Sequence, residues 1–168
     1  MEIRQVIAED LEYLIRIENL GFSEEEAATR AAFIKRIQLI ADSFLVALID
    51  GNVVGYVNGP VMQSLYITDD LFADVKQNPL EDGVQSILGL AVDPAFRRQG
   101  IARKLLEALE DAAKRTNRQA LSLTCKEELI RFYESCGYEN HGVSSSTHGN
   151  VKWYNLVKYL NVDDLKKD

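Results

Sequence analysis

A short segment in the middle of the chain, residues 97–102 (RRQGIA), has the residue types and order of a phosphate-binding turn. It follows an apolar run at residues 87–92 and a turn with Asp93 and Pro94. A strand that leads into a glycine-containing turn and then a helix presents several unpaired backbone N–H groups at one point. Gly100 has no Cβ, so a ligand can approach the backbone there. The two arginines add positive charge to a chain of net charge −7. We therefore predict a site for an anionic group such as a phosphate.

The residues after this turn repeat with the period of a helix that has one apolar face. Its apolar positions are Ile101, Ala102, Leu105, Leu106, Leu109, Ala112 and Ala113. Charged residues lie between them, and Glu110 and Lys114 have the i,i+4 spacing of a favourable ion pair. The pattern predicts a helix over residues 101–114 that packs on one face.

The turn and its flanking elements resemble the acetyl-CoA site of the GCN5-related N-acetyltransferase (GNAT) superfamily. The superfamily signature, Gln/Arg-x-x-Gly-x-Gly/Ala after a strand, is matched by Arg97-x-x-Gly100-x-Ala102. A second signature, F-Y-x-x-x-G-F/Y, is matched by residues 132–138 (FYESCGY) at the spacing that the family shows. Matching features extend along nearly the whole chain.

The resemblance implies a single α/β domain over residues 1–160, with a central, mostly antiparallel, splayed sheet and helices on both faces. In the family, the strand before the phosphate turn and the next strand separate at a bulge, and the pantetheine arm of the cofactor lies in the opening. Residues 161–168 are predicted to form a charged C-terminal tail.

The resemblance also implies which residues bind acetyl-CoA. The backbone N–H groups of residues 98–103 would bind the pyrophosphate, and the main chain of residues 90–92 would pair with pantetheine like an added strand. The N–H of Leu90 would polarise the thioester carbonyl. The cofactor-binding residues expected on this basis are Leu90, Ala91, Val92, Arg97, Arg98, Gln99, Gly100, Ile101, Ala102 and Arg103.

Tyr133 matches the general acid of the family, which protonates the departing CoA thiolate. A tyrosine with a pKa of about 10 is a reasonable donor to a thiolate of comparable basicity. Periodicity by itself favours a different interpretation, a packing tyrosine on the apolar face of a helix at residues 127–136. Its place in the second signature favours the catalytic role, so we expect Tyr133 and Leu90 to be the catalytic residues.

Within the superfamily, residues 44–59 and the C-terminal third of the chain resemble arylalkylamine N-acetyltransferases most closely. Animal members carry two histidines on the strand before the phosphate turn, and these are implicated in removing the amine proton. Ser86 and Leu88 stand at the corresponding positions. The sequence therefore identifies no general base, and an acidic residue of residues 61–85 acting through water is one candidate.

The activity implied by the resemblance is transfer of the acetyl group of acetyl-CoA to a primary amine by direct attack. No residue looks like a prepared nucleophile, because Cys125 has no evident histidine partner in the sequence. The acidic residues of residues 61–85 favour a small amine over a lysine or N-terminal amine of a protein. The alternative class is a CoA-binding sensor or interaction module without turnover, which the missing histidines favour and Tyr133 opposes.

Charge and composition indicate which binding partners and which cellular compartment to expect. The chain has 26 acidic and 19 basic residues. This acidic excess argues against a nucleic acid as binding partner and favours a cationic small molecule. The apolar runs are far shorter than the roughly 18 residues that cross a bilayer, and residues 1–4 begin no secretory signal. We expect a cytoplasmic protein that does not bind a membrane and that is a monomer or a homodimer.

The cysteines and histidines predict no metal site. Cys125 and Cys136 lie on either side of a predicted helix, without the spacing of a disulfide framework or a metal site. We expect two reduced, partly buried thiols. His141 and His148 are the only histidines of the sequence.

The elements that must position these residues alternate between strands and helices. Strands are predicted at residues 3–7, 44–49, 53–58, 87–92, 120–125, 138–144 and 151–160. A helix capped by Asp10 is expected to end near Gly21, and a second one, with Ser23 and Glu26 in a capping box, to run to about residue 41. The helix at residues 127–136 is closed by Gly137.

Two segments have alternative interpretations. Residues 61–85 lose periodicity, and such a long connection is often functional. It forms either a lid on the acceptor site or a solvated excursion with a short helix near residues 71–76. Phe22 and Phe33 either line the acceptor pocket or are plain core residues, and the core is the favoured interpretation.

Overall fold

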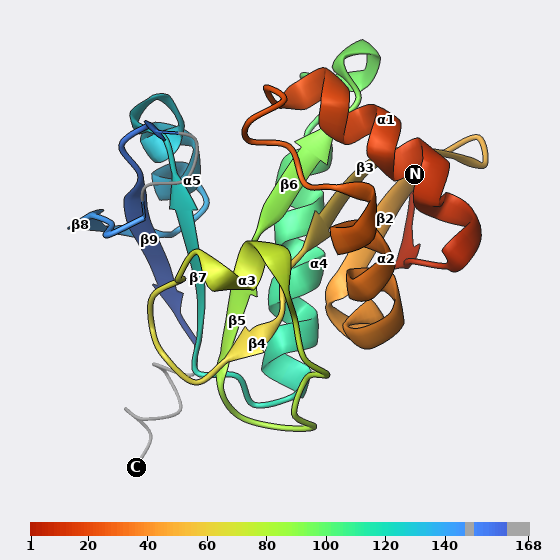
Figure 1. Ribbon diagram of the computed structural model, residues 1–168. Helices are drawn as coiled ribbons and strands as arrows, with labels where there is room; N and C mark the ends of the chain where they lie inside the picture. The colour runs from red at the N-terminus through yellow and green to blue at the C-terminus, as the bar shows by residue number, and fades with distance from the viewer. Residues whose placement is uncertain (147–149, 161–168) are drawn as a thin grey trace.

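The computed structural model describes residues 1–146 and 150–160, which form two sheets (Figure 1). The first has the strand order β1-β2-β3-β6 and is antiparallel throughout. The second has the order β4-β5-β7-β9-β8, in which β5 and β7 are parallel. The strands are β1 (Glu2–Gln5), β2 (Phe44–Ile49), β3 (Asn52–Asn58), β4 (Val61–Met62), β5 (Val84–Ile87), β6 (Gly89–Val92), β7 (Ala120–Cys125), β8 (Glu139–Val143) and β9 (Tyr154–Tyr159). The predicted tail at residues 161–168 and His148 lie outside the described residues.

Helices cover both faces of the sheets, so the predicted mixed α/β architecture is confirmed. On one face, Leu14 of α1 (Leu11–Gly21) and Phe33 of α2 (Arg30–Leu39) pack in one core cluster with Tyr56 of β3. On the other, Leu105 and Leu109 of α4 (Ile101–Arg115) pack with residues of β2, β3 and β7. The remaining helices are α3 (Asp70–Ala73), α5 (Ile130–Ser135) and the 3₁₀ turns η1 (Ala8–Asp10), η2 (Ala41–Ser43), η3 (Pro94–Phe96) and η4 (Glu127–Leu129). Within the described residues, no helix is long and apolar enough to cross a membrane.

The single strand predicted at residues 87–92 is wrong, because the chain changes sheets at Leu88. Asn58 is opposite Gly89. Val61, three residues after Asn58, is opposite Gln85, which lies four residues before Gly89. Residues 85–89 therefore contain one residue more than the segment opposite them, residues 58–61. Such an extra residue in one strand is a β-bulge. β5 pairs with β7, while β6 pairs with β3, and Figure 1 shows β6 and β7 diverging beyond this point. The splay expected from the resemblance thus has a local cause at Leu88.

The N-terminal helices differ from their predictions at their starts. Asp10 is the N-cap residue of α1, as predicted, but its side chain makes no capping bond, because its carboxylate accepts from the backbone N–H of Ile7 (2.9 Å) and pairs with Arg4. Ser23 and Glu26 do contact each other (3.0 Å), but they close one turn only. α2 begins at Arg30 with Thr29 as its cap. The helix breaks between these points, where Glu18 of α1 accepts the N–H of Ala28 (2.7 Å) and so takes this donor away from a helical bond.

Other predicted elements are confirmed with changed bounds. The β2–β3 hairpin turns at Asp50 and Gly51, both with positive φ, as an Asp-Gly tight turn requires. Residues 61–85 contain β4 and the short α3, so they are more ordered than their lack of periodicity indicated. The helix predicted at residues 127–136 is η4 followed by α5, and β8 and β9 pair antiparallel as expected.

Candidate active site

β6 forms the free edge of the first sheet and faces the opening between the sheets (Figure 1). The N–H of Asp93 donates to the carbonyl oxygen of Val54 (2.7 Å). Residues along an antiparallel strand alternate in the direction of their hydrogen bonds. Ala91 therefore turns its polar groups toward β3, whereas Leu90 and Val92 turn theirs toward the opening. No strand of the described residues pairs with them there, so this edge is available to an extended ligand.

The turn before α4 leaves an open space above the N-terminus of that helix. Gly100 has a φ of 76°, in the left-handed region, and a Cβ placed on it would meet no heavy atom within 4 Å. Arg98 also has a positive φ, of 66°. The first helical bond runs from the N–H of Lys104 to the carbonyl oxygen of Gly100 (3.1 Å), so the preceding N–H groups have no intrahelical acceptor. Unpaired N–H groups at a helix N-terminus suit an anion, and the space beside Gly100 leaves room for one.

The side chains of the predicted cofactor-binding segment have different environments. Arg97, Arg98 and Gln99 are exposed, whereas Ile101 is buried in the core. The guanidinium of Arg103 donates to the hydroxyl of Ser135 (2.9 Å), so its backbone N–H is the group that is left for a ligand. Ile101 and Arg103 thus offer main chain rather than side chain to the predicted site.

Asp93 fixes this turn to the rest of the protein. One of its carboxylate oxygens accepts the N–H of Ala95 (3.0 Å), and the other pairs with Arg16 of α1 (3.0 Å). The bond from Ala95 is the main cause that holds the pKa of Asp93 below its usual range, and Arg16 adds to it. The turn is therefore attached to α1.

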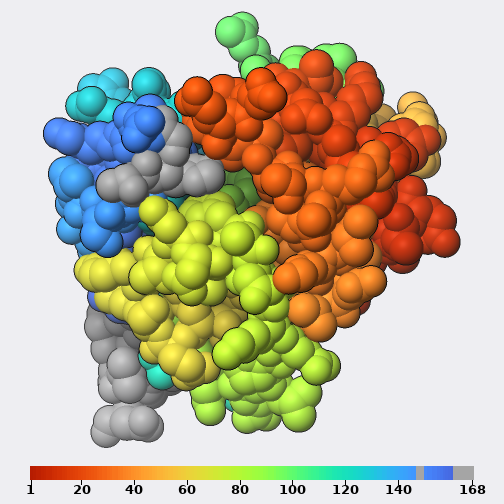
Figure 2. Space-filling view, viewed as in Figure 1, coloured from red at the N-terminus to blue at the C-terminus, as the bar shows by residue number. Residues whose placement is uncertain are grey.

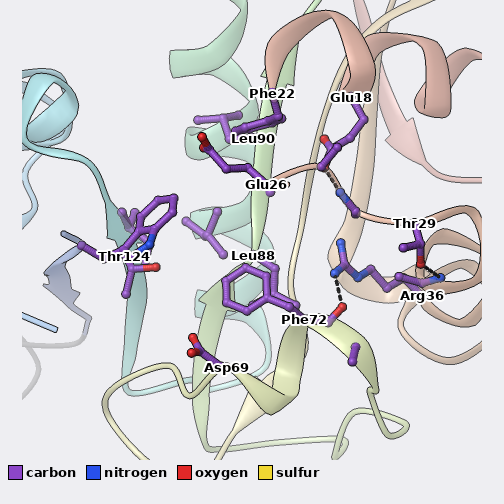
Figure 3. Close-up of a pocket in the computed structure, with 18 of the residues that line it drawn as sticks. Glu18, Phe22, Glu26, Thr29, Arg36, Asp69, Phe72, Leu88, Leu90 and Thr124 are labelled. Carbon is purple, nitrogen blue, oxygen red and sulfur yellow. Dashed lines mark hydrogen bonds between the residues drawn. The ribbon is translucent and has the colours of Figure 1, made fainter. Parts of the chain in front are cut away.

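A cavity of ≈ 520 Å³ lies at the opening. Its walls come from the β5–β6 junction and the end of β7, from the segment between α1 and α2, and from α3 (Figure 3). On the surface, the red-to-orange N-terminal segment and the yellow residues of the connection after β4 border a hollow, with green residues visible at its base (Figure 2). Leu88 and Leu90 line this cavity, so it adjoins the free edge of β6.

Tyr133, the predicted general acid, lines the cavity from α5 and is 7% exposed. Its ring packs edge-on against Phe132 and Tyr138, with centroids 5.1 and 5.7 Å away. Burial, followed by the thiols of Cys125 and Cys136, raises the pKa of Tyr133 above its ordinary value. The phenol therefore stays protonated near neutral pH and is available as a proton donor. Both cysteines are free thiols, as expected.

Glu18 of α1 lines the same cavity and was not singled out from the sequence. Figure 3 shows it across the cavity from Thr124, with Leu90 between them. Its carboxylate accepts hydrogen bonds from the hydroxyl of Tyr56 and from the N–H of Ala28. Burial raises the pKa of Glu18 above the usual range, and these two bonds offset it only in part. A buried carboxylate of raised pKa in a cavity is a candidate proton acceptor.

The sequence does contain a signal for Glu18. Leu14, Ile17 and Glu18 have the i, i+3, i+4 spacing of one helix face, and all three are buried. A glutamate at an apolar position of a helix requires a buried partner. That partner, Tyr56, lies 38 residues away in the chain, which is why spacing alone does not reveal the pair.

Ser86 and Leu88, at which the resemblance predicted a departure from two histidines, have separate environments. Ser86 is fully buried within the sheet, and its hydroxyl donates to the carbonyl oxygen of Pro60 (2.5 Å). Leu88 lines the cavity. Neither side chain accepts a proton from an amine, so this function must come from another residue.

The cavity lining includes several acidic and aromatic residues. In addition to Glu18 and Tyr133, the acidic and aromatic residues that line the cavity are Glu24, Glu25, Glu26, Asp69, Phe22, Phe72 and Trp153. Glu26 pairs with Lys126 (2.8 Å). Of the acidic residues noted between residues 61 and 85, Asp69 reaches the cavity, whereas Asp74 pairs with Lys35 (2.9 Å). Phe22 is thus a pocket residue, while Phe33 is a core residue.

The sequence profile of the acetyltransferase (GNAT) family matches residues 9–138, which is more than half of the chain. The chain belongs to this family. An N-alpha-acetyltransferase of Saccharolobus solfataricus is 28% identical to this GNAT protein over 106 residues, which cover 63% of this chain and 58% of that relative. The match thus spans less than two thirds of the relative's length.

Solved structures confirm the fold of this GNAT protein. A GNAT-like decarboxylase, GphF, in complex with isobutyryl-CoA superposes with a TM-score of 0.80 at 19% identity, covering 95% of this chain and 100% of that chain. Arabidopsis thaliana Naa50, in complex with the bisubstrate analogue CoA-Ac-MVNAL, superposes with a TM-score of 0.73 at 17% identity, covering 95% and 98%. The predicted superfamily is confirmed, but none of these relatives is named as an arylalkylamine N-acetyltransferase, so that closer resemblance is unsupported.

Proposed function

We propose that this protein is an acetyl-CoA-dependent N-acetyltransferase that moves the acetyl group to a primary amine by direct attack. One observation carries most of the proposal. The cavity beside the free strand edge at Leu90 is lined by a buried phenol, Tyr133, and by a buried carboxylate, Glu18. Family membership and the N-alpha-acetyltransferase relative support the same activity.

The residues have complementary roles in the proposed reaction. Acetyl-CoA lies along β6, with its pyrophosphate at the N-terminus of α4 and its thioester carbonyl beside the N–H of Leu90. Glu18 takes a proton from the ammonium group of the acceptor and leaves a neutral amine. The amine nitrogen bonds to the carbonyl carbon, the C–S bond breaks, and Tyr133 gives its proton to the departing thiolate. The extra proton on the new amide nitrogen passes through water to the Tyr133 phenolate, and Glu18 releases its proton to solvent, which restores both groups.

The geometry supports Glu18 as the proton acceptor better than the acidic residues of the cavity rim. A Cβ on Gly89 would lie 2.9 Å from the hydroxyl oxygen of Tyr56, so the Glu18–Tyr56 pair is directly beside β6. Glu18 is 5% exposed, whereas Glu24 and Glu25 are more accessible to water. A carboxylate shielded from water has the stronger tendency to hold a proton near neutral pH.

We propose a small amine as the acceptor, because the rim residues Glu24, Glu25 and Asp69 would attract its ammonium group. The N-terminal amine of a peptide is the second candidate, and the N-alpha-acetyltransferase relative favours it. The location in the cytoplasm and the monomeric or homodimeric state remain predictions.

Release of free CoA thiol from acetyl-CoA tests the proposal. The purified protein would be mixed with acetyl-CoA and a panel of arylalkylamines, polyamines, lysine and short peptides with free N-termini. We expect amine-dependent thiol release for at least one class. Binding of acetyl-CoA without release for any amine would favour a CoA-binding sensor, and failure to bind CoA would contradict both functions.

A further inference from the structure

Arg36 of α2 is a charged side chain inside the cavity wall. It is 2% exposed and lines the cavity. Its Nη2 donates to the backbone carbonyl oxygen of Phe72 (2.9 Å), and its Nη1 makes a long bond to Oδ1 of Asn58 (3.4 Å). Figure 3 shows the guanidinium between Glu18 and Phe72. The guanidinium thus contacts two neutral oxygens.

Two neighbouring donors of this group have no acceptor within the described part of the chain. Nε of Arg36 is buried without a hydrogen-bond partner, and so is Nδ2 of Asn58, whose side chain is fully buried. An unsatisfied buried donor costs about 1–3 kcal/mol, and more when it is charged. Adjacent orphaned donors on an arginine and its hydrogen-bond partner indicate a missing acceptor.

Among residues 1–146 and 150–160, the charge of Arg36 is also without a direct counter-ion. No carboxylate oxygen of the described residues lies within the 4.0 Å of an ion pair. Glu18 is near enough to favour the charged guanidinium, but its oxygens accept from Tyr56 and Ala28 instead. Buried charges in proteins are normally paired. A cation buried in a cavity wall without a paired anion is a site for an anionic ligand group.

We propose that Arg36, which lines the cavity and is bonded to Asn58 behind the cavity wall, forms a carboxylate subsite, so that the ligand carries a carboxylate beside the group that reacts. The inference rests on the proposed transferase activity. A carboxylate matches the planar fork of donors that a guanidinium presents. With Glu18 facing the ammonium group and Arg36 the carboxylate, the acceptor is of the amino acid type. The same subsite would also fit an acyl-CoA whose acyl group ends in a carboxylate.

Matched ligands distinguish these sources. Thiol release would be compared for phenylalanine, its amide and 2-phenylethylamine with acetyl-CoA, and for succinyl-CoA against acetyl-CoA with one amine. If the acceptor supplies the carboxylate, phenylalanine has a lower KM than the amide and the amine. If the donor supplies it, succinyl-CoA has the lower KM. Equal KM values in both comparisons would overturn the subsite.

Variants assign the effect to Arg36. Arg36→Gln should raise the KM of the preferred carboxylate ligand about 10- to 100-fold and leave the KM of its uncharged partner unchanged. Arg36→Lys should restore part of the difference. Arg30→Gln, on the same helix but in an exposed pair with Glu12, is the matched control and should change neither value. Equal losses for both ligands in Arg36→Gln would mean that Arg36 only supports the fold and would overturn the proposal.

Asn58→Asp offers a second test if Arg36→Gln does not fold. The new carboxylate would supply the missing anion inside the protein, so we expect a more heat-stable protein that no longer prefers the carboxylate ligand. An unchanged preference would contradict the subsite. Thermal stabilisation by N-acetylphenylalanine over N-acetyl-2-phenylethylamine, measured with CoA present, checks binding without turnover. A wild-type protein that acetylates no amine would reject the proposed function, whereas equal stabilisation by the two products together with equal KM values for succinyl-CoA and acetyl-CoA would reject this subsite alone.

Discussion

The hydroxyl of Tyr56 donates a hydrogen bond to the carboxylate of Glu18 inside the protein, beside Gly89 at the start of β6. This pair joins α1 to the strand that borders the opening. In the proposed mechanism this pair supplies the shielded proton acceptor that the sequence did not identify. The consequences are testable through the pH dependence of the reaction.

Glu18→Gln should lower kcat about 10²- to 10³-fold while acetyl-CoA binding is retained. In the wild type, kcat/KM should rise with pH as Glu18 loses its proton. Because burial raises the pKa of Glu18, this rise should lie above the pH range of an ordinary glutamate, whose pKa is about 4.3. The measurement is the pH profile of amine-dependent thiol release.

Two further variants serve as controls for Glu18. Tyr56→Phe removes a donor that lowers the pKa of Glu18, so it should move the rising limb to still higher pH. Glu12→Gln, at an exposed position of the same helix, should leave the profile unchanged. Full activity and an unchanged profile in Glu18→Gln would show that another group accepts the proton.

Tyr133→Phe should lower turnover about 10²-fold and preserve the affinity for acetyl-CoA, because only the proton donor is lost. The pKa of Tyr133 is raised by burial. Its deprotonation should therefore cause no loss of wild-type activity below about pH 10. Turnover would be followed by thiol release, and affinity by calorimetry. Unchanged turnover would remove Tyr133 from the mechanism.

Gly100→Ala should weaken CoA binding, because the new Cβ would occupy the open space above the N-terminus of α4. The positive φ of Gly100 also makes any L-residue strained, by about 1 kcal/mol. Gly51→Ala is the matched control, since Gly51 has a φ of 80° in the β2–β3 turn, also with nothing within 4 Å. Both variants should lose similar stability, and equal CoA affinities in the two would contradict the predicted phosphate site.

Glu110→Gln tests an electrostatic contact between α4 and β9. Glu110 pairs with Lys158 (2.5 Å) and with Lys114 (3.2 Å), the latter as predicted. Burial raises the pKa of Glu110, but the hydrogen bonds from the two lysines outweigh it and hold the pKa below its usual range. The pair therefore stabilises the protein above the unfolded-state pKa, and this contribution disappears as the pH falls through the folded-state pKa.

At pH 7 we expect Glu110→Gln to lower the free energy of unfolding by about 1 kcal/mol. Urea unfolding of both proteins should show this difference shrinking from about pH 5 downward. A difference that stays constant with pH would mean that packing, not charge, is responsible.

Local patterns were sufficient to predict the β2–β3 hairpin, the turn before α4 and α4 itself. The turn before α4 depends on adjacent residues only, so RRQGIA and the helical repeat after it specify the left-handed Gly100. The hairpin is likewise local, because Asp50 and Gly51 determine it.

Features that depend on pairing between distant segments could not be predicted from local patterns. The division of residues 84–92 into β5 and β6 arises from a one-residue mismatch with residues 58–62, which an apolar run does not reveal. α2 starts late because Glu18 holds Ala28. The Glu18–Tyr56 pair and the buried Arg36 depend on the same long-range packing, which is why the acceptor side of the site was the part that the sequence left open.

One single-turnover measurement tests the central claim most directly. Enzyme in excess over acetyl-CoA would be mixed with the best amine of the panel, and free thiol and acetylated amine would be quantified in the same samples. We predict that the two appear together in equal amounts, and more slowly in Glu18→Gln and Tyr133→Phe. Thiol release without acetylated amine, or no thiol release with any amine, would contradict direct acetyl transfer by this protein.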